Sequence, residues 1–340
     1  MCFGHDGDGA LERSLAQKGA SRRGLLRGAA GAAAGVAALG AVASPAVASD
    51  PRKPRGAGRG HGGGKQVPHD KVSIQLYTLR SAAANPNPAN PAAIGYLAVL
   101  DAVARYGYEL VELAGLYGQS AAALRATLDD LGLRASSSHD GISANDGAAH
   151  TKFQNAVTLG QEYVNVPYLN STSLADWQRW ADQMNHEAVL AKGYGLKYGY
   201  HNHAHEFTID LGGGLTPWEV FMDRLDHKLV HLEVDLYWAF TAGVNTGHTT
   251  ADSALQFAKD VVNDAPLRVR QYHVKDRTGM GTTQAQADMC DLGVGVIDFA
   301  ELFRNHQVEE YIVENDTPDN PAAPLLTAAV GHLYLEHLRF

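Results

Sequence analysis

After Lys71 the chain alternates eight times between short apolar runs and longer helical stretches, and this alternation limits the folds open to it. The short runs are rich in Val, Ile and Tyr, as buried strands usually are. We expect strands at 72–77, 109–113, 133–138, 163–167, 196–202, 229–236, 268–274 and 311–315. Eight strands, each followed by a helix over about 270 residues, predict a single-domain parallel (β/α)₈ barrel, or TIM barrel, at 71–340.

The stretches between the strands carry helix start and stop signals, such as Thr216 before Pro217 and Gly107 and Gly193 after helical segments. We expect helices at 94–106, 120–131, 148–159, 174–192, 217–225, 251–264, 299–306 and 321–337. The longest loops fall around 243–250 and 277–297, at the end of a barrel where functional residues lie. A doubly wound open sheet is the alternative fold, but no Gly-x-Gly-x-x-Gly follows the first strand.

Residues 1–48 have the order of a twin-arginine secretion signal. Paired arginines at 22–23 precede a weakly apolar Ala/Gly stretch, and Ala46-Val47-Ala48 gives a small-x-small cleavage site. A transmembrane anchor is disfavoured because the stretch is poor in Leu, Ile and Phe. Residues 49–70, rich in Gly, Arg and Pro, are predicted to be a flexible linker. We therefore expect export by the twin-arginine machinery, a periplasmic or extracellular location and no membrane attachment of the mature protein.

Charge is distributed unevenly along the chain. Residues 1–71 contain 11 Lys and Arg against 5 Asp and Glu, whereas the remainder contains 17 against 32. A barrel this acidic repels phosphate backbones, so we expect no nucleic-acid partner. The two cysteines, Cys2 and Cys290, are too few for a disulfide framework.

Four consecutive predicted strands end in groups that bind metals. The run Tyr-His-Asn-His-Ala-His-Glu-Phe, at 200–207, closes the fifth strand, and Asp235, His273 and Glu314 lie in the next three. An unpaired charge in an apolar strand is costly, and either a buried ion-pair network or a metal would remove that cost. The recurrence on four strands favours the metal. Carboxylate and imidazole ligands without thiolate suit Mn²⁺, Co²⁺, Fe²⁺ or Mg²⁺.

The chain resembles the xylose-isomerase-like TIM barrel superfamily of sugar isomerases and epimerases. The resemblance rests on segments 74–80, 201–207, 235–238, 273–276 and 313–316, in matching order and spacing. It implies one divalent ion, Mn²⁺ first, with Co²⁺, Mg²⁺, Fe²⁺ or Zn²⁺ as alternatives. The implied ligands from the last three strands are Asp235, His273 and Glu314. At the fifth strand His201 stands where a Glu is usual and Glu206 follows in the loop, so either could be the ligand.

The expected function is a secreted, metal-dependent sugar isomerase or epimerase that removes a proton next to a carbonyl group and forms an enediolate. Candidate catalytic residues are Glu206, Glu314, His203 and Lys275. Candidate pocket residues are Tyr77, Arg80, His139, Tyr168 and Trp238, where Trp238 stands in place of a substrate-binding His of the ketose epimerases.

Three other functions stay open. The first is a lyase or hydrolase that uses the same proton abstraction to cleave 3-keto glycosides. The second is a nuclease like endonuclease IV, which the acidic barrel disfavours. The third is a non-catalytic sugar-binding barrel. Export favours an unphosphorylated sugar or glycoside as the small-molecule partner, and assembly into a homo-oligomer is compatible with the sequence.

Overall fold

The structure, a computed structural model, describes residues 64–86, 93–281, 288–318 and 324–340. The predicted signal peptide and residues 49–63 of the predicted linker lie outside these ranges. Residues 64–70, assigned to the same linker, lie against the barrel. The backbone N–H of Lys65 donates to the carbonyl of Phe340 at 2.7 Å, the N–H of Phe340 donates back at 3.0 Å, and Val67 is buried.

Eight parallel strands form one sheet in the order β3-β2-β1-β10-β7-β6-β5-β4. Their bounds are β1 Val72–Gln75, β2 Leu110–Leu113, β3 Arg134–Ser138, β4 Tyr163–Val166, β5 Lys197–His201, β6 Val230–Asp235, β7 Val269–Val274 and β10 Glu310–Val313. The first strand pairs with the last, and a parallel bridge between His139 and Asn165 brings the ends of β3 and β4 together. All eight predicted strands are confirmed, and the sheet is a nearly closed TIM barrel.

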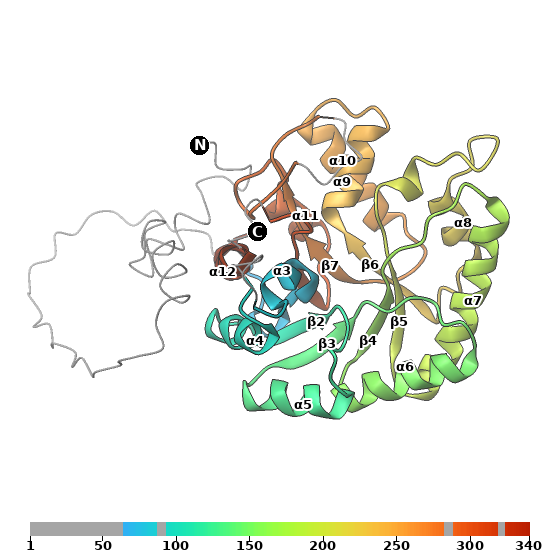
Figure 1. The fold of residues 1–340 in the computed structure, drawn as a ribbon. Helices are drawn as coiled ribbons and strands as arrows, with labels where there is room; N and C mark the ends of the chain where they lie inside the picture. Colours follow the sequence, from blue (N-terminus) through green and yellow to red (C-terminus); the bar gives the residue numbers. More distant parts are fainter. Residues whose placement is uncertain (1–63, 87–92, 282–287, 319–323) are drawn as a thin grey trace, which may run out of the picture.

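Helices surround the barrel, and Figure 1 shows α5 to α8 following its outer side. Their bounds are α3 Arg80–Ala83, α4 Tyr96–Arg105, α5 Ala121–Asp130, α6 Asp146–Leu159, α7 Leu174–Gly193, α8 Pro217–Arg224, α9 Leu236–Asn245, α10 Ala251–Asn263, α11 Phe299–Asn305 and α12 Pro324–His337. Side chains cap several of them: Thr216 and Thr250 each form a capping box, and Ser120 accepts a hydrogen bond from the N–H of Ala123. In the part of the chain that the structure describes, no helix is both long and apolar enough to cross a membrane.

Helix α9 is absent from the sequence-based prediction, which places a long loop around 243–250. Residues 236–244 are all buried, so no polar face produces the period of 3.6 that marks a helix. The helix begins at Asp235, whose Oδ1 accepts the N–H of Trp238 at 2.9 Å. The last residue of β6 is therefore also the N-cap of α9.

Strand β1 is shorter than predicted, because the chain turns into the 3₁₀ helix η2, Leu76–Leu79, after Gln75. The Gln75 side chain accepts the N–H of Tyr77 at 3.0 Å and caps that turn. After β7 the chain forms a short hairpin of β8, Asp276–Arg277, and β9, Met289–Cys290, within the predicted loop. The buried carboxylate of Asp276 accepts four backbone N–H groups, those of Arg277, Gly293, Gly295 and Ile297, and so ties this loop to the end of β7.

The apolar core lies between the sheet and the helices, whereas the interior of the barrel is polar. Inward-facing side chains such as Gln75, Glu112, Asn165, Glu233 and Gln271 are all fully buried. They form hydrogen bonds with one another across the barrel, as between Gln75 and Glu112 at 2.9 Å and between Asn165 and Glu233 at 2.6 Å. The alternation of inward and outward residues along each strand places these charges beneath the carboxyl ends of the strands.

Candidate active site

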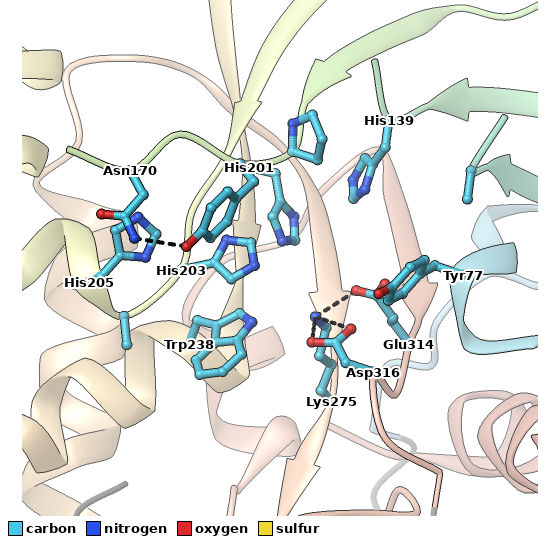
Figure 2. A pocket seen from close by; sticks show the side chains of 14 residues that line it. Tyr77, His139, Asn170, His201, His203, His205, Trp238, Lys275, Glu314 and Asp316 are labelled. Carbon is cyan, nitrogen blue, oxygen red and sulfur yellow. Dashed lines mark hydrogen bonds and ion pairs between the residues drawn. The ribbon is translucent and has the colours of Figure 1, made fainter. Parts of the chain in front are cut away.

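A cavity of about 860 Å³ opens at the carboxyl end of the barrel strands. Figure 2 shows side chains from several strand ends and loops pointing into it. Its lining consists of Tyr77, Ala114, His139, Pro167, Tyr168, Asn170, His201, His203, Ala204, His205, Trp238, Lys275, Glu314 and Asp316. Functional sites of TIM barrels lie at this end of the fold.

Four predicted ligands come together at the base of the cavity, and we call them the upper cluster: His201, Asp235, His273 and Glu314. His201 and Glu314 line the cavity, and Asp235 and His273 are fully buried next to them. One possible ligand atom from each lies within 4.8 Å of the others. The Nδ1 atom of His273 is 2.6 Å from Oε2 of Glu314, and Nε2 of His201 is 3.6 Å from Oδ2 of Asp235. The parallel register produces this arrangement, since Asp235 pairs with His273 and the N–H of Glu314 donates to the carbonyl of Val274.

Lys275 carries a buried positive charge beside the upper cluster. Its Nζ lies 2.8 Å from Oδ2 of Asp235, 2.6 Å from Oε2 of Glu314 and 3.2 Å from the carboxylate of Asp316. Figure 2 shows Glu314 and Asp316 converging on this ammonium. Burial opposes the charge, but the three carboxylates, Asp235 foremost, raise the pKa of Lys275 well above its ordinary value. The three carboxylates therefore favour the charged form of the lysine.

A second layer of charge lies directly below, which the sequence analysis did not include among the site residues. We call Glu112 and Glu233 the lower carboxylates. Oε1 of Glu233 lies 2.8 Å from Nε2 of His139, 3.2 Å from Nδ1 of His201 and 3.2 Å from Nε2 of His273. Oε2 of Glu112 lies 2.7 Å from Nε2 of His273. The signal for Glu233 was its position two residues before Asp235, which puts both side chains on one face of a strand.

The two layers contain more carboxylates than positively charged groups. Burial raises the pKa of both Glu112 and Asp235. Burial also opposes the charge on Glu233 and Glu314, yet His273 beside the first and Lys275 beside the second hold their pKa values well below the ordinary range. Two carboxylates are therefore strongly stabilised as anions, and two are not.

The histidines also fall into two groups, one with a raised pKa and one with lowered pKa values. Burial opposes the charge on His273, but Glu233 and Glu314 raise its pKa well above the ordinary value. Burial and the neighbouring His273 lower the pKa of His201 to about 3, so its imidazole is neutral. Burial and His201 lower the pKa of His203 well below its usual range. A neutral imidazole can bind a metal or accept a proton, whereas a protonated one can only donate a proton. His273 would therefore have to lose a proton on binding a metal.

The donor set of the upper cluster fits a divalent metal ion. It offers two carboxylates and two imidazoles at the open end of a barrel, the ligand types that suit Mn²⁺, Fe²⁺, Co²⁺ or Zn²⁺. The carboxylates Glu112, Glu233, Asp235, Glu314 and Asp316 outnumber the one ammonium. A divalent cation would offset the cost of burying the charge on Asp235 and Glu112, and the repulsion between Glu112 and Glu233.

The structure does not bring Glu206 into the upper cluster. Its carboxylate is buried, accepting the hydroxyl of Tyr200 at 2.6 Å and the backbone N–H of His203 at 2.9 Å. The turn of η3, His205–Phe207, directs it behind the cavity wall, so Glu206 is not among the lining residues. Of the two alternatives at the fifth strand, His201 is the residue that lies beside Asp235.

Aromatic groups form the walls of the cavity. The ring centres of Trp238 and His203 lie 5.3 Å apart, with the ring planes tilted by 33°. In the described chain Nε1 of Trp238 and Nδ1 of His203 are buried without a hydrogen-bond partner. Tyr77 and Tyr168 are among the exposed aromatics at the rim. Arg80 does not line the cavity: its guanidinium lies 3.9 Å from the ring centre of Tyr77 and donates to the carbonyl of Asp316 at 2.6 Å.

Two curated relatives are inosose dehydratases. The chain is 27% identical to the Bacillus licheniformis protein over 169 residues, which are 47% of this chain and 54% of that protein, so the match spans about half the length of this relative. It is 25% identical to the Geobacillus kaustophilus protein over 282 residues, 71% of this chain and 86% of the relative.

Solved structures share the fold. A sugar phosphate isomerase/epimerase from Parabacteroides distasonis superposes with a TM-score of 0.61 at 20% identity, covering 80% of this chain and 95% of that one. The probable 3-DHS dehydratase of Bacillus anthracis gives 0.55 at 12% identity, covering 76% and 97%. A Mycobacterium smegmatis barrel in complex with magnesium gives 0.53 at 14% identity, covering 78% and 96%.

The family model of the xylose isomerase-like TIM barrel matches residues 100–314. This range runs from α4 to the end of β10 and contains every residue of the upper cluster. The chain belongs to the xylose isomerase-like TIM barrel family.

Proposed function

We propose that this protein is a divalent-metal-dependent enzyme that removes the proton next to a carbonyl group of an unphosphorylated carbohydrate. The observation that carries the proposal is the upper cluster with Lys275 at the floor of an 860 Å³ cavity. Perturbed ionisable groups that converge in a cleft are typical of active sites.

His201, Asp235, His273 and Glu314 would hold the metal, for which we propose Mn²⁺. When bound, such an ion polarises a substrate carbonyl and stabilises the negative charge that develops on its oxygen. Lys275 is held by three carboxylates beside this position and would stabilise the same charge.

His203 is the residue we propose to move protons. It lines the cavity, and its buried Nδ1 has no hydrogen-bond partner within the described chain, so the atom is available to a substrate. Glu206 accepts the backbone N–H of His203 at 2.9 Å and would hold the loop in place. We therefore assign Glu206 a positioning role and neither a ligand nor a proton-transfer role.

We propose β-elimination as the outcome, with isomerisation or epimerisation as the second candidate. In the first step the α C–H bond breaks, its electron pair forms the enolate and the proton passes to the base. In the second step the C–O bond at the β-carbon breaks, and the leaving oxygen takes a proton. The observation that favours elimination is that two curated relatives and one solved neighbour are named as dehydratases. In a 3-keto glycoside the same step would expel the aglycone.

The charge of the cavity supports an unphosphorylated substrate. Among the described lining residues Lys275 is the one Lys or Arg, and three carboxylates already contact it. A phosphate group would bring further negative charge without a partner of its own. We also propose export by the twin-arginine route, which the N-terminal sequence supports. Sugar phosphates are mainly cytoplasmic compounds, so they do not suit an exported enzyme as substrates.

The test is a product assay with the Mn²⁺-loaded protein on a 3-keto glucoside with a chromogenic aglycone, a keto-inositol and a ketose. Elimination predicts aglycone release or dehydration, and isomerisation predicts a new sugar without release. The matched phosphorylated ketose should be at least about tenfold poorer in kcat/KM, because its phosphate lacks a cation. Failure to transform any of these by a protein that binds metal and sugar would favour the non-catalytic sugar-binding barrel.

A further inference from the structure

We infer that the lower carboxylates, above all Glu233, are positioning residues that fix which nitrogen of His201 faces the metal. The inference rests on the proposed metal site. It assigns a role to a buried layer that the proposed chemistry does not itself use.

Each histidine of the upper cluster has one nitrogen toward each layer. His201 has Nε2 toward Asp235 and Nδ1 toward Glu233, at 3.6 and 3.2 Å. His273 has Nδ1 toward Glu314 and Nε2 toward Glu112, at 2.6 and 2.7 Å. In each imidazole, the nitrogen on the side of the upper cluster could therefore bind a metal, and the other nitrogen lies next to a lower carboxylate.

An imidazole binds a metal through an unprotonated nitrogen, and the hydrogen bond at the other nitrogen decides which one that is. A carboxylate can only accept, so Glu233, whose Oε1 is 3.2 Å from Nδ1 of His201, favours a proton on that nitrogen. Within the described residues Nδ1 of His201 has no aligned hydrogen bond, and a small rotation of the imidazole would form one. Nε2 of His201 then carries the lone pair toward Asp235. In the same way Glu112 requires a proton on Nε2 of His273 when Nδ1 is a ligand.

The lower carboxylates are themselves fixed by amides. Asn165 donates its Nδ2 to Oε2 of Glu233 at 2.6 Å, which leaves Oε1 for the imidazoles. Gln75 donates its Nε2 to Oε2 of Glu112 at 2.9 Å, the same oxygen that faces His273. This difference in partners predicts different effects of the two Glu→Gln substitutions.

In Glu233→Gln, the donor from Asn165 would hold the amide oxygen on its own side. The amide NH₂ would then face the imidazoles and donate to Nδ1 of His201, which moves the proton of His201 to Nε2 and blocks the ligand atom. In Glu112→Gln, the donors from Gln75 and His273 both hold the amide oxygen in place, so His273 keeps its orientation.

The alternative is a second metal ion in the lower layer, because His139, His201, Glu233 and His273 also have ligand atoms within 4.8 Å of one another. The hydrogen bonds of Glu233 favour the positioning role. Both of its oxygens already have a partner, Oε2 in the amide of Asn165 at 2.6 Å and Oε1 in Nε2 of His139 at 2.8 Å.

The experiment compares the purified wild-type protein with Glu233→Gln, Glu112→Gln and Glu310→Gln. Glu310 is the control, a buried barrel carboxylate that contacts Ser136 at 2.5 Å and Gln271 at 2.9 Å. Titration calorimetry with Mn²⁺ should give one ion per wild-type chain. The dissociation constant should rise about 10- to 100-fold in Glu233→Gln, and only a few-fold or not at all in the other two.

Nitrogen-15 NMR of the metal-free protein gives a second readout, independent of activity and of metal binding. The wild-type His201 should carry its proton on Nδ1, and Glu233→Gln should move that proton to Nε2. An unchanged metal affinity of Glu233→Gln, a wild-type His201 protonated on Nε2, or two ions per wild-type chain would each overturn the inference. A wild-type chain that binds no divalent ion, but has His201 protonated on Nδ1, would overturn the proposed function and leave the tautomer assignment supported.

Discussion

Nδ1 of His273 lies 2.6 Å from Oε2 of Glu314, although the two residues are 41 positions apart in the chain. Strands β7 and β10 are hydrogen-bonded neighbours, and Ile312 pairs with His273, so Glu314 reaches the same level as the imidazole. An imidazole and a carboxylate are thereby held together at the carboxyl end of the barrel, with Lys275 2.6 Å from the same oxygen. The predictions below test what this arrangement binds and does.

Asp235 has two separable roles. Its Oδ1 caps helix α9 through the N–H of Trp238, and its Oδ2 faces His201 and Lys275. Asp235→Asn should keep the cap, because Asn caps as well as Asp. The substitution removes the anionic ligand, so Mn²⁺ affinity should fall by at least about tenfold. Asp235→Ala should also lose roughly 1 kcal/mol of unfolding free energy from the missing cap. Calorimetry of both variants measures the metal affinity, and denaturant unfolding measures the unfolding free energy. Equal metal affinity in Asp235→Asn and the wild type would contradict the ligand role.

Substitution of His201 should affect metal binding, and substitution of Glu206 should affect the rate of the reaction. His201→Gln should lose most of its metal affinity, whereas Glu206→Gln should bind Mn²⁺ as the wild type does and lose kcat, because the His203 loop is less well held. Tyr200→Phe removes a second hydrogen-bond partner of Glu206, at 2.6 Å, and serves as the matched control, because Glu206 keeps its bond to the N–H of His203. The check is metal stoichiometry after dialysis together with steady-state kinetics. Metal loss in Glu206→Gln with retention in His201→Gln would reverse the assignment.

Lys275 should matter most to the metal-free protein. Lys275→Met leaves Asp235, Glu314 and Asp316 buried without their ammonium, and breaking a buried ion pair on one side costs about 3–5 kcal/mol. A divalent ion would replace part of the lost positive charge. We therefore expect a large loss of unfolding free energy without Mn²⁺ and a partial recovery with it, measured by urea denaturation. Equal losses with and without the ion would mean that it does not bind next to these carboxylates.

Glu310 gives the fold a pH dependence of its own. Burial, with a contribution from the neighbouring carboxylate of Glu112, raises its pKa from the ordinary value of 4.5 to about 7, although the hydrogen bond from Ser136 opposes this shift. The folded protein therefore binds this proton more tightly than the unfolded chain, and its contribution is present below pH about 4.5 and lost as the pH rises to about 7. Integrated over that range the loss is roughly 3 kcal/mol. Glu310→Gln should flatten this part of the profile of unfolding free energy against pH, and an unchanged slope would contradict the assignment.

The strands and most helices could be predicted because their apolar periodicity reflects burial on one or two faces. Helix α9 could not, because it is buried on all sides and its Leu, Tyr, Trp and Phe residues resemble a strand. The order of Asp235, His273 and Glu314 along the chain sufficed to place them on consecutive strand ends. That the three side chains lie close together could be seen only from the register in which these strands pair.

The lower carboxylates were missed for a different reason. Glu112 lies in a predicted strand that contains no predicted site residue, so nothing in the sequence tells which of its side chains face into the barrel. Glu233 shares a strand face with Asp235, but that position alone does not tell that its carboxylate contacts the ligand histidines. Glu206 could not be separated from His201 either, because only the turn at η3 directs its carboxylate toward Tyr200 and away from the cavity.

The proposed proton abstraction is tested most directly by solvent deuterium uptake at the α-carbon of a keto sugar or 3-keto glycoside, followed by NMR in the presence of Mn²⁺. Proton abstraction beside the carbonyl predicts uptake by the wild-type protein, or deuterium in the elimination product. Metal removal should abolish it, and His203→Gln should reduce it by about 10²-fold or more. Turnover in which the product keeps the α-proton of the substrate, or uptake unchanged by metal removal and by His203→Gln, would contradict the proposed proton abstraction.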